Sequence, residues 1–299
     1  MARFDERATQ RRGLGELLRW QVTSLLGAGR DRTGFVTPRR DGAIPASGAS
    51  LTWIGHATFV LRLAGKLVAT DPIWSMRVGG VVKRKAPPGV PLEAVPPLDV
   101  VLVTHDHMDH MDFPTLRRLA RPGVLAVTPL GNGPRLRGCG FERVVELDWW
   151  QAHREGDLDI TLVPARHWSM RAPRTRNETL WGGFVLRGPE GCVYHSGDTA
   201  FFDGFREIGE RFAIDWALLP IGGYKPRWFF EPQHVDPDEA LRAFEMLKAK
   251  TFVAMHWGTF RLTDEPLGEP AERLRKAWTR DPSDLWLLDV GESRALSAR

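Results

Sequence analysis

The sequence predicts a layered α/β fold with helices outside its sheets. Beyond residue 50, short apolar or alternating segments take turns with segments of helical spacing, which is typical of such folds. The run DVVLV at residues 99–103 is continuously apolar, as expected of a strand that is covered on both faces. With 299 residues, 42% of them hydrophobic, the chain can bury a substantial core, and we expect one large domain at residues 51–299.

The individual elements follow from the same patterns. Segments rich in β-branched and aromatic residues, bounded by Gly, Pro or Asp, predict strands, whereas apolar residues spaced three and four apart predict helices. Strands are expected within residues 51–70, at 99–103, 124–128, 143–147, 159–164, 180–188, 192–196, 215–220 and 251–256, and helices at 113–120, 205–212 and 237–249.

The first 50 residues form a basic N-terminal segment. They hold nine Lys or Arg and five Asp or Glu, which leaves 32 residues of each sign in the rest of the chain. Apolar residues recur at helical spacing over residues 14–26, next to Arg11, Arg12 and Arg19, and predict an amphipathic helix, followed by a linker at residues 27–50. Two interpretations remain open: the helix packs on the domain, or residues 11–26 make peripheral contact with a membrane.

Composition excludes several classes of protein. No apolar run approaches the roughly 20 residues that cross a bilayer, and the N-terminus lacks the apolar stretch of a secretory signal. Cys139 and Cys192 lie far apart, so neither a disulfide framework nor a thiolate zinc site is indicated. The basic residues follow no nucleic-acid-binding motif. We expect a cytoplasmic protein, with contact at the inner membrane face as the alternative; the sequence predicts no oligomeric state.

The segment H-D-H-M-D-H holds the densest group of candidate ligands in the chain. It follows the predicted strand at residues 99–103 and contains His105, His107, Asp109 and His110. Imidazole nitrogens and carboxylate oxygens are ligands that zinc accepts, and residues two apart in an extended chain point the same way. His105 and His107 can therefore bind one ion, while Asp109 and His110 face a neighbouring position.

Further candidate ligands follow other predicted strands. His167 comes after DITLVPA, Asp198 lies in a Ser-Gly-Asp-Thr turn after CVYHS, and His256 ends TFVAMH. Each is a polar residue just after an apolar strand, which is where an α/β fold gathers functional groups. Leaving so many ionisable groups buried and unpaired would be costly, so the set as a whole predicts a metal centre.

These residues resemble the metallo-β-lactamase superfamily over roughly residues 50–292. More specifically, the chain is similar to the branch of phospholipases D that hydrolyse N-acylphosphatidylethanolamine. The matching motifs are WIGHAT (53–58), TDPIWS (70–75), ELDWW (146–150), HW (167–168), EIGERF (207–212), PIGGYKPRWF (220–229), QHVDP (233–237), HWGTF (256–260) and GESR (291–294).

The resemblance implies an αββα sandwich with two metal ions in a cleft at the sheet edges. It assigns His105, His107 and His167 to one zinc ion and Asp109, His110 and His256 to the other, with Asp198 bridging them. Two Zn²⁺ ions are therefore the expected cofactors, although iron or manganese would bind similar ligands.

Other residues of the matching motifs have open roles. His234 is either a helix-entry residue, because Asp236 and Pro237 already explain a helix start, or a catalytic group near the substrate phosphate, as the resemblance implies. Gln233 next to it belongs to the expected substrate site. In the loop before an aromatic run, Lys225, Arg227 and Trp228 are either a phosphate-binding and apolar wall or an ordinary solvated loop.

Two residues are expected to support the ligands. His56, in WIGHAT, either locks a turn or holds a ligand by hydrogen bonding, and Asp71 is either a turn residue or an acceptor for a ligand histidine. His153 and His195 have no ligand context and are expected to be structural.

The predicted function is a metal-dependent hydrolase, most directly a phosphodiesterase of phospholipase D type that acts on N-acylphosphatidylethanolamine-like or related phosphodiesters. A hydroxide shared by the metal ions would attack phosphorus, with Asp109 and His234 as catalytic residues and His234 as proton donor or phosphate anchor. The alternative is a lactonase or other ester or amide hydrolase, because the same hydroxide attacks carbonyl carbon. A third hypothesis, a binding protein without turnover, fits seven intact ligands poorly.

Overall fold

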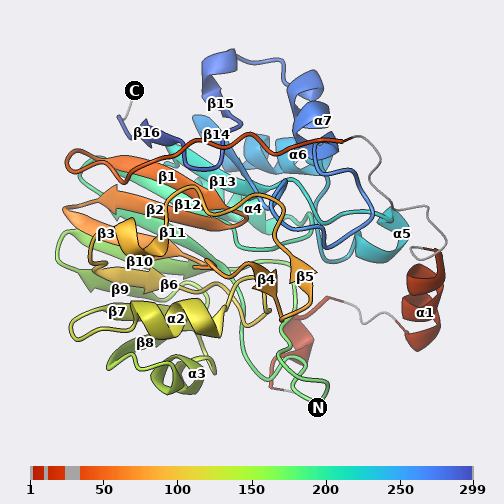
Figure 1. The fold of residues 1–299 in the computed structure, drawn as a ribbon, viewed down its shortest axis with the longest axis horizontal. Coiled ribbons are helices and arrows are strands. Elements are labelled where there is room, and N and C mark those ends of the chain that lie inside the picture. Colours follow the sequence, from red (N-terminus) through yellow and green to blue (C-terminus); the bar gives the residue numbers. More distant parts are fainter. Residues whose placement is uncertain (1–2, 10–12, 24–33, 298–299) are drawn as a thin grey trace.

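Two mixed sheets stacked face to face form the centre of the molecule (Figure 1). The computed structural model describes residues 3–9, 13–23 and 34–297. Within these ranges each large sheet has seven strands, and a separate hairpin is formed by β4 (Arg77–Val78) and β5 (Val82–Lys83). Helices cover the outer faces of both sheets, so the predicted αββα sandwich is confirmed.

The first sheet has the strand order β16-β1-β2-β3-β6-β7-β8. Pairing is antiparallel from β16 to β3 and parallel from β3 to β8. Its strands are β1 (Ser50–Gly55), β2 (Thr58–Leu63), β3 (Lys66–Thr70), β6 (Val100–Leu102), β7 (Leu125–Pro129), β8 (Arg143–Leu147) and β16 (Ser293–Ala295).

The second sheet has the order β15-β14-β13-β12-β11-β10-β9. It is antiparallel from β9 to β12 and parallel from β12 to β15. Its strands are β9 (Ala152–Glu155), β10 (Leu158–Val163), β11 (Gly183–Gly188), β12 (Gly191–His195), β13 (Trp216–Pro220), β14 (Thr251–Met255) and β15 (Leu285–Trp286). Strands β6, β12 and β14, in or next to the parallel halves, lead into three loops of the site described below, whereas two further loops of the site follow β1 and β10 in the antiparallel halves.

The helices of the described residues are α1 (Leu14–Thr23), α2 (Phe113–Leu119), α3 (Gly133–Gly138), α4 (Gly204–Arg211), α5 (Arg227–Phe230), α6 (Pro237–Leu247) and α7 (Glu269–Ala277), with 3₁₀ turns at Asp5–Arg7, Leu92–Ala94 and Pro282–Asp284. Figure 1 shows α2 and α3 beside β7 and β8, whereas α4, α6 and α7 lie over the other sheet.

Strand β6 shows why the layers form. Val100 and Leu102 belong to the core between the sheets, whereas Val101 and the following Val103 belong to the cluster under α2 and α3. Both faces of the strand are therefore buried, as its continuously apolar sequence predicts. This strand leads directly into His105.

Helix α6 begins where the sequence predicts. The Asp236 carboxylate accepts a hydrogen bond from the backbone N–H of Glu239 at 2.9 Å, and the Glu239 carboxylate accepts one from the backbone N–H of Asp236 at 3.2 Å. This reciprocal pair satisfies two N–H groups at the helix start. It also fixes the chain two residues after His234.

The N-terminal segment contacts the domain where it is described. Phe4 is buried, and the backbone N–H of Thr9 donates to the carbonyl of His167 at 3.0 Å. Helix α1 (Leu14–Thr23) lies within the predicted helix at residues 14–26. Residues 34–49, predicted as part of a linker, are largely without regular secondary structure, but they pack on the domain: Ile44 is buried in a core cluster, and the backbone N–H of Arg40 donates to the carbonyl of Val290 at 2.8 Å. Arg11, Arg12, and residues 24–33 of the predicted helix and linker lie outside the described residues. No helix in the described part of the chain is long and apolar enough to cross a membrane.

The large predicted elements are present, with small shifts at their ends. The predicted helix at residues 205–212 is α4, for example, and the predicted strand at residues 143–147 is β8. No sequence pattern predicted β4, β5, β9, α3, α5, α7 or the edge strands β15 and β16, which are short or polar.

Candidate metal centre

The H-D-H-M-D-H segment bridges β6 and α2. The chain leaves β6 at Leu102 and enters α2 after Asp112, whose carboxylate accepts a hydrogen bond from the backbone N–H of Thr115 at 3.3 Å. A strand end and a capped helix start thus hold the segment from both sides. As a result, His105 and His110 are buried just beyond the end of β6.

Three histidines form one half of a cluster. Nδ1 of His107 lies 2.9 Å from Nε2 of His105 and 3.2 Å from Nε2 of His167. One nitrogen from each ring therefore faces a common point. His167 reaches it from the loop after β10, 60 residues away in the chain from His107.

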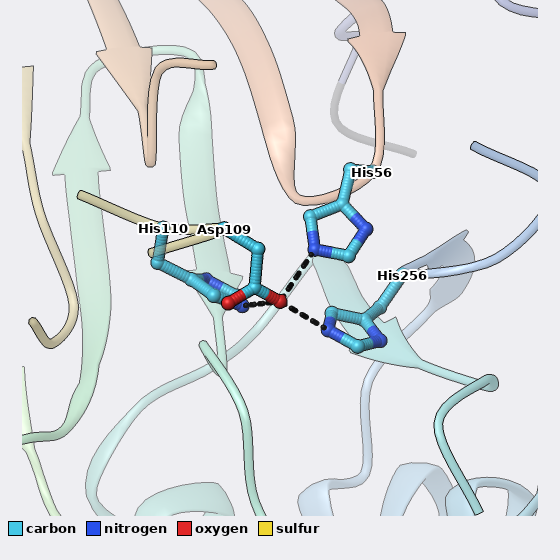
Figure 2. Close-up of side chains that lie close together, drawn as sticks. All are labelled: His56, Asp109, His110 and His256. Atoms are coloured by element: carbon cyan, nitrogen blue, oxygen red, sulfur yellow. Dashed lines mark hydrogen bonds and ion pairs between the residues drawn. The ribbon is translucent and has the colours of Figure 1, made fainter. Parts of the chain in front are cut away.

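A carboxylate and three further histidines form the other half. Figure 2 shows Asp109 among His56, His110 and His256, all pointing inward. Oδ2 of Asp109 lies 3.1 Å from Nε2 of His56 and 3.6 Å from Nε2 of both His110 and His256. His56 was expected in a supporting role, and it lies as near to Asp109 as the predicted ligands do.

Asp198 lies between the two halves. Its Oδ2 is 3.2 Å from Nε2 of His110, and its Oδ1 is 3.2 Å from Nε2 of His256. It also lies close enough to His105 and to His167 for a shared ion. The structure thus brings all seven predicted ligands into one cluster, with the single carboxylate that was expected to bridge at its centre.

Several inward-facing atoms of the cluster lack a hydrogen bond. Among the described residues, Nε2 of His110, Nε2 of His256, Oδ1 of Asp198 and Nδ1 of His234 are buried and have no hydrogen-bond partner. Buried polar atoms rarely lack a hydrogen bond, and here only ion-pair contacts to Asp198 and Asp109, at 3.2 to 3.8 Å, take its place. Imidazole nitrogens and carboxylate oxygens converging in this way fit divalent metal ions such as zinc.

Burial keeps His105, His107 and His167 neutral. It lowers the pKa of His107 to about 4 and that of His167 to about 3, and it holds the pKa of His105 well below its ordinary value. A neutral imidazole offers a lone pair, which is the form that binds a metal.

The other half of the cluster is held together by opposite charges. Burial opposes charge on His110 and His256, but Asp198 and Asp109 outweigh it, so that the pKa of His110 is raised well above its ordinary value and that of His256 to about 9. Burial likewise opposes charge on the two aspartates, yet the histidines hold the pKa of each well below its ordinary value. The two carboxylates therefore favour positive charge beside them. Without metal, protons on His110 and His256 provide this charge, and metal ions can provide it instead.

Hydrogen bonds behind the cluster orient its rings. Oδ2 of Asp71 lies 2.8 Å from Nδ1 of His110, and the Thr104 hydroxyl donates to the same oxygen at 2.7 Å while lying 3.0 Å from Nδ1 of His105. The backbone carbonyl of Gln233 accepts a hydrogen bond from Nδ1 of His167 at 3.0 Å. Such contacts fix which nitrogen faces a metal. Thr104 was not predicted from the sequence, although its place directly before His105 is a usable signal.

The backbone is strained around the cluster. His56, Asp71 and His256 have positive φ angles of 58°, 37° and 60°, a region that residues with a Cβ atom rarely adopt. Gly197, before Asp198, has a φ of 60°, and a Cβ there would lie 2.8 Å from Cβ of Thr104. Strained positions of this kind gather at functional sites, where the surrounding structure maintains them.

His234 faces the cluster from the segment before α6. Its Nδ1 lies 3.8 Å from Oδ2 of Asp198, and its ring packs against those of His167 and His256. Burial lowers the pKa of His234 to about 3, so its ring is neutral at pH 7. The side chain is therefore placed to meet a group bound beside Asp198.

The predicted cations of the neighbouring loop are paired within the protein. Lys225 donates to Glu269 at 2.8 Å, and Arg227 donates to Glu239 at 2.8 Å and to the backbone carbonyl of His234 at 2.9 Å. Trp228 lies under the guanidinium of Arg19. These contacts favour a supporting role for the loop; their use in substrate binding stays a prediction.

Residues outside the predicted set also shape the site. Arg171 donates to the backbone carbonyls of Asp106 at 3.3 Å and Met111 at 2.7 Å, so it ties the loop after β10 to the ligand segment. Nothing in the sequence signals this role. His153 lies near the surface in β9, while His195 is buried and its Nε2 lies 3.0 Å from the carbonyl of Ala57, a structural contact.

Comparison with known proteins agrees with this geometry. The model of the Beta-lactamase superfamily domain matches residues 67–257. The chain is 35% identical over 248 residues to N-acyl-phosphatidylethanolamine-hydrolyzing phospholipase D 1 of Caenorhabditis elegans, covering 77% of this chain and 70% of that one. A solved metallo hydrolase from Ignicoccus hospitalis superposes with a TM-score of 0.63 at 25% identity, covering 83% of this chain and 98% of that one.

A further relative is an uncharacterised protein of Mycobacterium tuberculosis. It is 41% identical over 243 residues, which cover 78% of this chain. The match spans 64% of the length of the mycobacterial protein, so about a third of that protein lies outside the match.

Proposed function

Because the chain belongs to the metallo-β-lactamase superfamily, in the branch of the N-acylphosphatidylethanolamine-hydrolysing phospholipases D, and is thus a metal-dependent hydrolase, we propose that it cleaves phosphodiesters of phospholipid type. The proposed cofactors are two zinc ions. His105, His107 and His167 would hold one and Asp109, His110 and His256 the other, with Asp198 shared between them.

The position of Asp198 is the observation that best supports this proposal. Its two oxygens face different histidines, each at 3.2 Å, and the three-histidine half lies beside it. One carboxylate between two sets of ligands suits a pair of adjacent ions. Two-metal sites of this kind are common in enzymes that hydrolyse phosphate esters.

When bound, the metal ions supply an activated water molecule and neutralise the charge that develops on the phosphate. The protein residues orient the reacting groups. Asp71, Thr104 and the Gln233 carbonyl hold the ligand rings in fixed directions. A pre-oriented site need not reorganise during the reaction, which lowers its barrier.

We assign His234 to the substrate phosphate. Its Nδ1 is buried without a hydrogen-bond partner among the described residues and lies beside Asp198, so an N–H there would donate to a phosphoryl or leaving-group oxygen. Because its ring is neutral, His234 would donate a hydrogen bond to such an oxygen rather than a proton, and would thus anchor the phosphate. Asp109, held against His56, His110 and His256, would serve both as ligand and as hydrogen-bond acceptor for the attacking water.

The choice of a phosphodiester over a carbonyl substrate rests on the relative of known reaction. The Caenorhabditis elegans protein is a phospholipase D, and it is 35% identical to this chain over 248 residues, which cover 77% of this chain. An ester, lactone or amide remains the competing substrate class, since the fold alone does not select one.

A substrate screen tests the proposal. Purified protein of measured metal content is assayed against bis(p-nitrophenyl) phosphate, a phospholipid panel and a lactone panel. We expect turnover of the phosphodiesters and about two metal ions per chain. Turnover of carbonyl compounds alone would overturn the proposed reaction class, and metal analysis would decide between zinc, iron and manganese.

A matched pair of variants tests the role of Asp198. Asp198→Ala should lose metal and reduce phosphodiester turnover at least a hundredfold, because both halves of the cluster lose a ligand. Asp203→Ala, at an exposed position five residues later, should leave both unchanged. If Asp198→Ala kept full metal content and turnover, the assignment would be wrong.

A further inference from the structure

The buried side chain of His195 connects the two sheets beside the metal centre. His195 is the last residue of β12, and its side chain is fully buried. Its Nδ1 accepts a hydrogen bond from the backbone N–H of Gly197 at 3.2 Å, and its Nε2 lies 3.0 Å from the backbone carbonyl of Ala57. Gly197 directly precedes Asp198, whereas Ala57 lies in the turn between β1 and β2 of the first sheet. One imidazole ring therefore joins the turn that carries Asp198 to the opposite sheet.

The two backbone partners fix the form of this ring. An N–H group can only donate a hydrogen bond and a carbonyl can only accept one, so Nδ1 carries a lone pair and Nε2 carries the proton. Phe59 meets the ring edge-on with centroids 6.3 Å apart, and Phe184 lies opposite His195 in the neighbouring strand β11. The ring is therefore held in one orientation and in one neutral form.

The Ala57 end of the connection is anchored independently of His195. The Ala57 carbonyl also accepts a hydrogen bond from the Thr70 hydroxyl at 3.0 Å. In the same turn, the backbone N–H of His56 donates to the Thr259 hydroxyl at 2.7 Å. Because these contacts fix the turn between β1 and β2, the Ala57 carbonyl is a firm point for the ring to hold on to.

The Asp198 end needs such a firm point. Gly197 has a φ of 60°, and a Cβ there would lie 2.8 Å from Cβ of Thr104, so this turn runs close to the ligand segment. The oxygens of Asp198 lie 3.2 Å from His110 and from His256. Groups of a functional site must be held within about 0.5 Å of their working position. A shift of the turn would move the carboxylate relative to both sets of ligands.

We propose that His195 is a positioning residue of the metal centre: anchored on Ala57, its ring holds the N–H of Gly197 and thereby sets the place of Asp198, an inference that rests on the proposed sharing of Asp198 by two metal ions. His195 acts through the backbone of the turn and is not itself a ligand.

Three substitutions separate the two hydrogen bonds of the ring. His195→Asn places an amide oxygen near the position of Nδ1 and so keeps an acceptor for Gly197. His195→Gln places its amide near the position of Nε2, which keeps the contact with Ala57 but leaves the N–H of Gly197 without this acceptor. His195→Phe keeps the approximate shape of the ring and loses both contacts.

The affinity of the metal-free proteins for Zn²⁺, measured by competition with a chromophoric chelator, tests the proposal. Loss of a contact behind a ligand lowers metal affinity about 10- to 100-fold, so His195→Gln and His195→Phe should bind Zn²⁺ at least tenfold more weakly, whereas His195→Asn should stay within about threefold of the unaltered protein. Equal affinities of His195→Asn and His195→Gln would overturn the proposal, and this comparison stands even if His195→Phe does not fold.

A buried hydrogen bond at the other end of β12 provides the control for stability. The Asp215 carboxylate accepts a hydrogen bond from the backbone N–H of Cys192 at 2.8 Å. Asp215→Ala leaves that N–H without this acceptor and should lower the urea midpoint of the metal-free protein about as much as His195→Gln does, with Zn²⁺ affinity unchanged. If Asp215→Ala weakened Zn²⁺ binding as much as His195→Gln, loss of stability alone would explain the effect and the proposal would fall.

The visible absorption of Co²⁺-loaded protein is a second readout, because the bands of this ion depend on the geometry of its ligands. His195→Gln should shift the bands relative to the unaltered protein, whereas His195→Asn and Asp215→Ala should leave them in place. An unshifted spectrum of His195→Gln would contradict a role in positioning Asp198.

These readouts separate the role of His195 from the proposed reaction. If the unaltered protein hydrolyses no phosphodiester, the proposed substrate class is wrong, whereas Zn²⁺ affinity and the Co²⁺ spectrum still decide the role of His195. If it does hydrolyse them, His195→Gln saturated with metal should show a kcat about tenfold lower at an unchanged KM, because a displaced carboxylate misaligns the reacting groups. Equal kcat values for His195→Gln and His195→Asn would count against the proposal.

Discussion

Asp71 Oδ2 lies 2.8 Å from Nδ1 of His110, and both side chains are fully buried. The contact turns Nε2 of His110 toward Asp198, 3.2 Å away. The same aspartate accepts hydrogen bonds from the backbone N–H and the hydroxyl of Thr104, both at 2.7 Å, directly before His105. A single carboxylate thus positions both ends of the ligand segment.

We predict that Asp71→Asn lowers metal affinity about 10- to 100-fold, as removal of such contacts behind a ligand typically does. The amide keeps the shape of the side chain but loses its charge and one acceptor. Competition with a chromophoric chelator measures the affinity. Asp159→Asn, at a surface ion pair with Arg187, is the control and should bind metal normally; equal affinity of the two variants would contradict the prediction.

Metal binding should stabilise the fold. The cluster draws on segments from both sheets, from His56 to His256, and it cannot exist in the unfolded chain. A ligand at about 1,000 times its dissociation constant adds about 4 kcal/mol to the free energy of unfolding if it binds the native state alone. Urea unfolding with zinc and with a chelator should show a difference of this order, and Asp198→Ala should show a much smaller one.

The strands and the polar residues at their ends could be predicted from the sequence, but the contacts between distant segments could not. DVVLV predicted a strand covered on both faces, and β6 leads into His105 as expected. His167, Asp198 and His256 could be chosen because each follows an apolar strand. The approach of His56 to Asp109 depends on a turn between β1 and β2 that meets a loop 53 residues later, and local pattern does not specify such a meeting.

The missing elements have a common physical reason. Helix α7 buries only Pro270, Ala271 and Leu274, so its apolar stripe is narrow and its sequence is dominated by charge. Strand β9, with the sequence AHRE, has no apolar alternation and owes its structure to pairing with β10. The role of Arg171 depends on two backbone carbonyls, and a sequence pattern does not display those.

Arg227 should act through His234. Its guanidinium donates to the His234 carbonyl at 2.9 Å and to Glu239 at 2.8 Å, so it clamps the segment before α6. Arg227→Lys removes this planar fork, and we expect kcat for a phosphodiester to fall about tenfold with metal content unchanged. Lys225→Met, which breaks a surface ion pair with Glu269, should have a smaller effect. Equal kinetics in both variants would argue against the clamp.

Cys192 should be chemically inert in the folded protein. Burial, reinforced by the nearby Asp215 carboxylate, raises the pKa of its thiol to about 12. At pH 8 an ordinary thiol is about one quarter thiolate, whereas a thiol with this pKa is about one ten-thousandth thiolate. Ellman's reagent should therefore leave Cys192 unmodified in a Cys139→Ser variant until urea unfolds it.

The same shift sets the sign of a pH dependence. Because the folded state holds the Cys192 proton more tightly than the unfolded state, its contribution to stability is fully present below about pH 8.5, the ordinary pKa, and declines as the pH rises toward 12. Cys192→Ser should flatten the fall in the free energy of unfolding between pH 8.5 and pH 10, about 1 to 2 kcal/mol for one group. An unchanged slope, or rapid modification of folded Cys139→Ser protein at pH 8, would show that the thiol is not held in the protonated state.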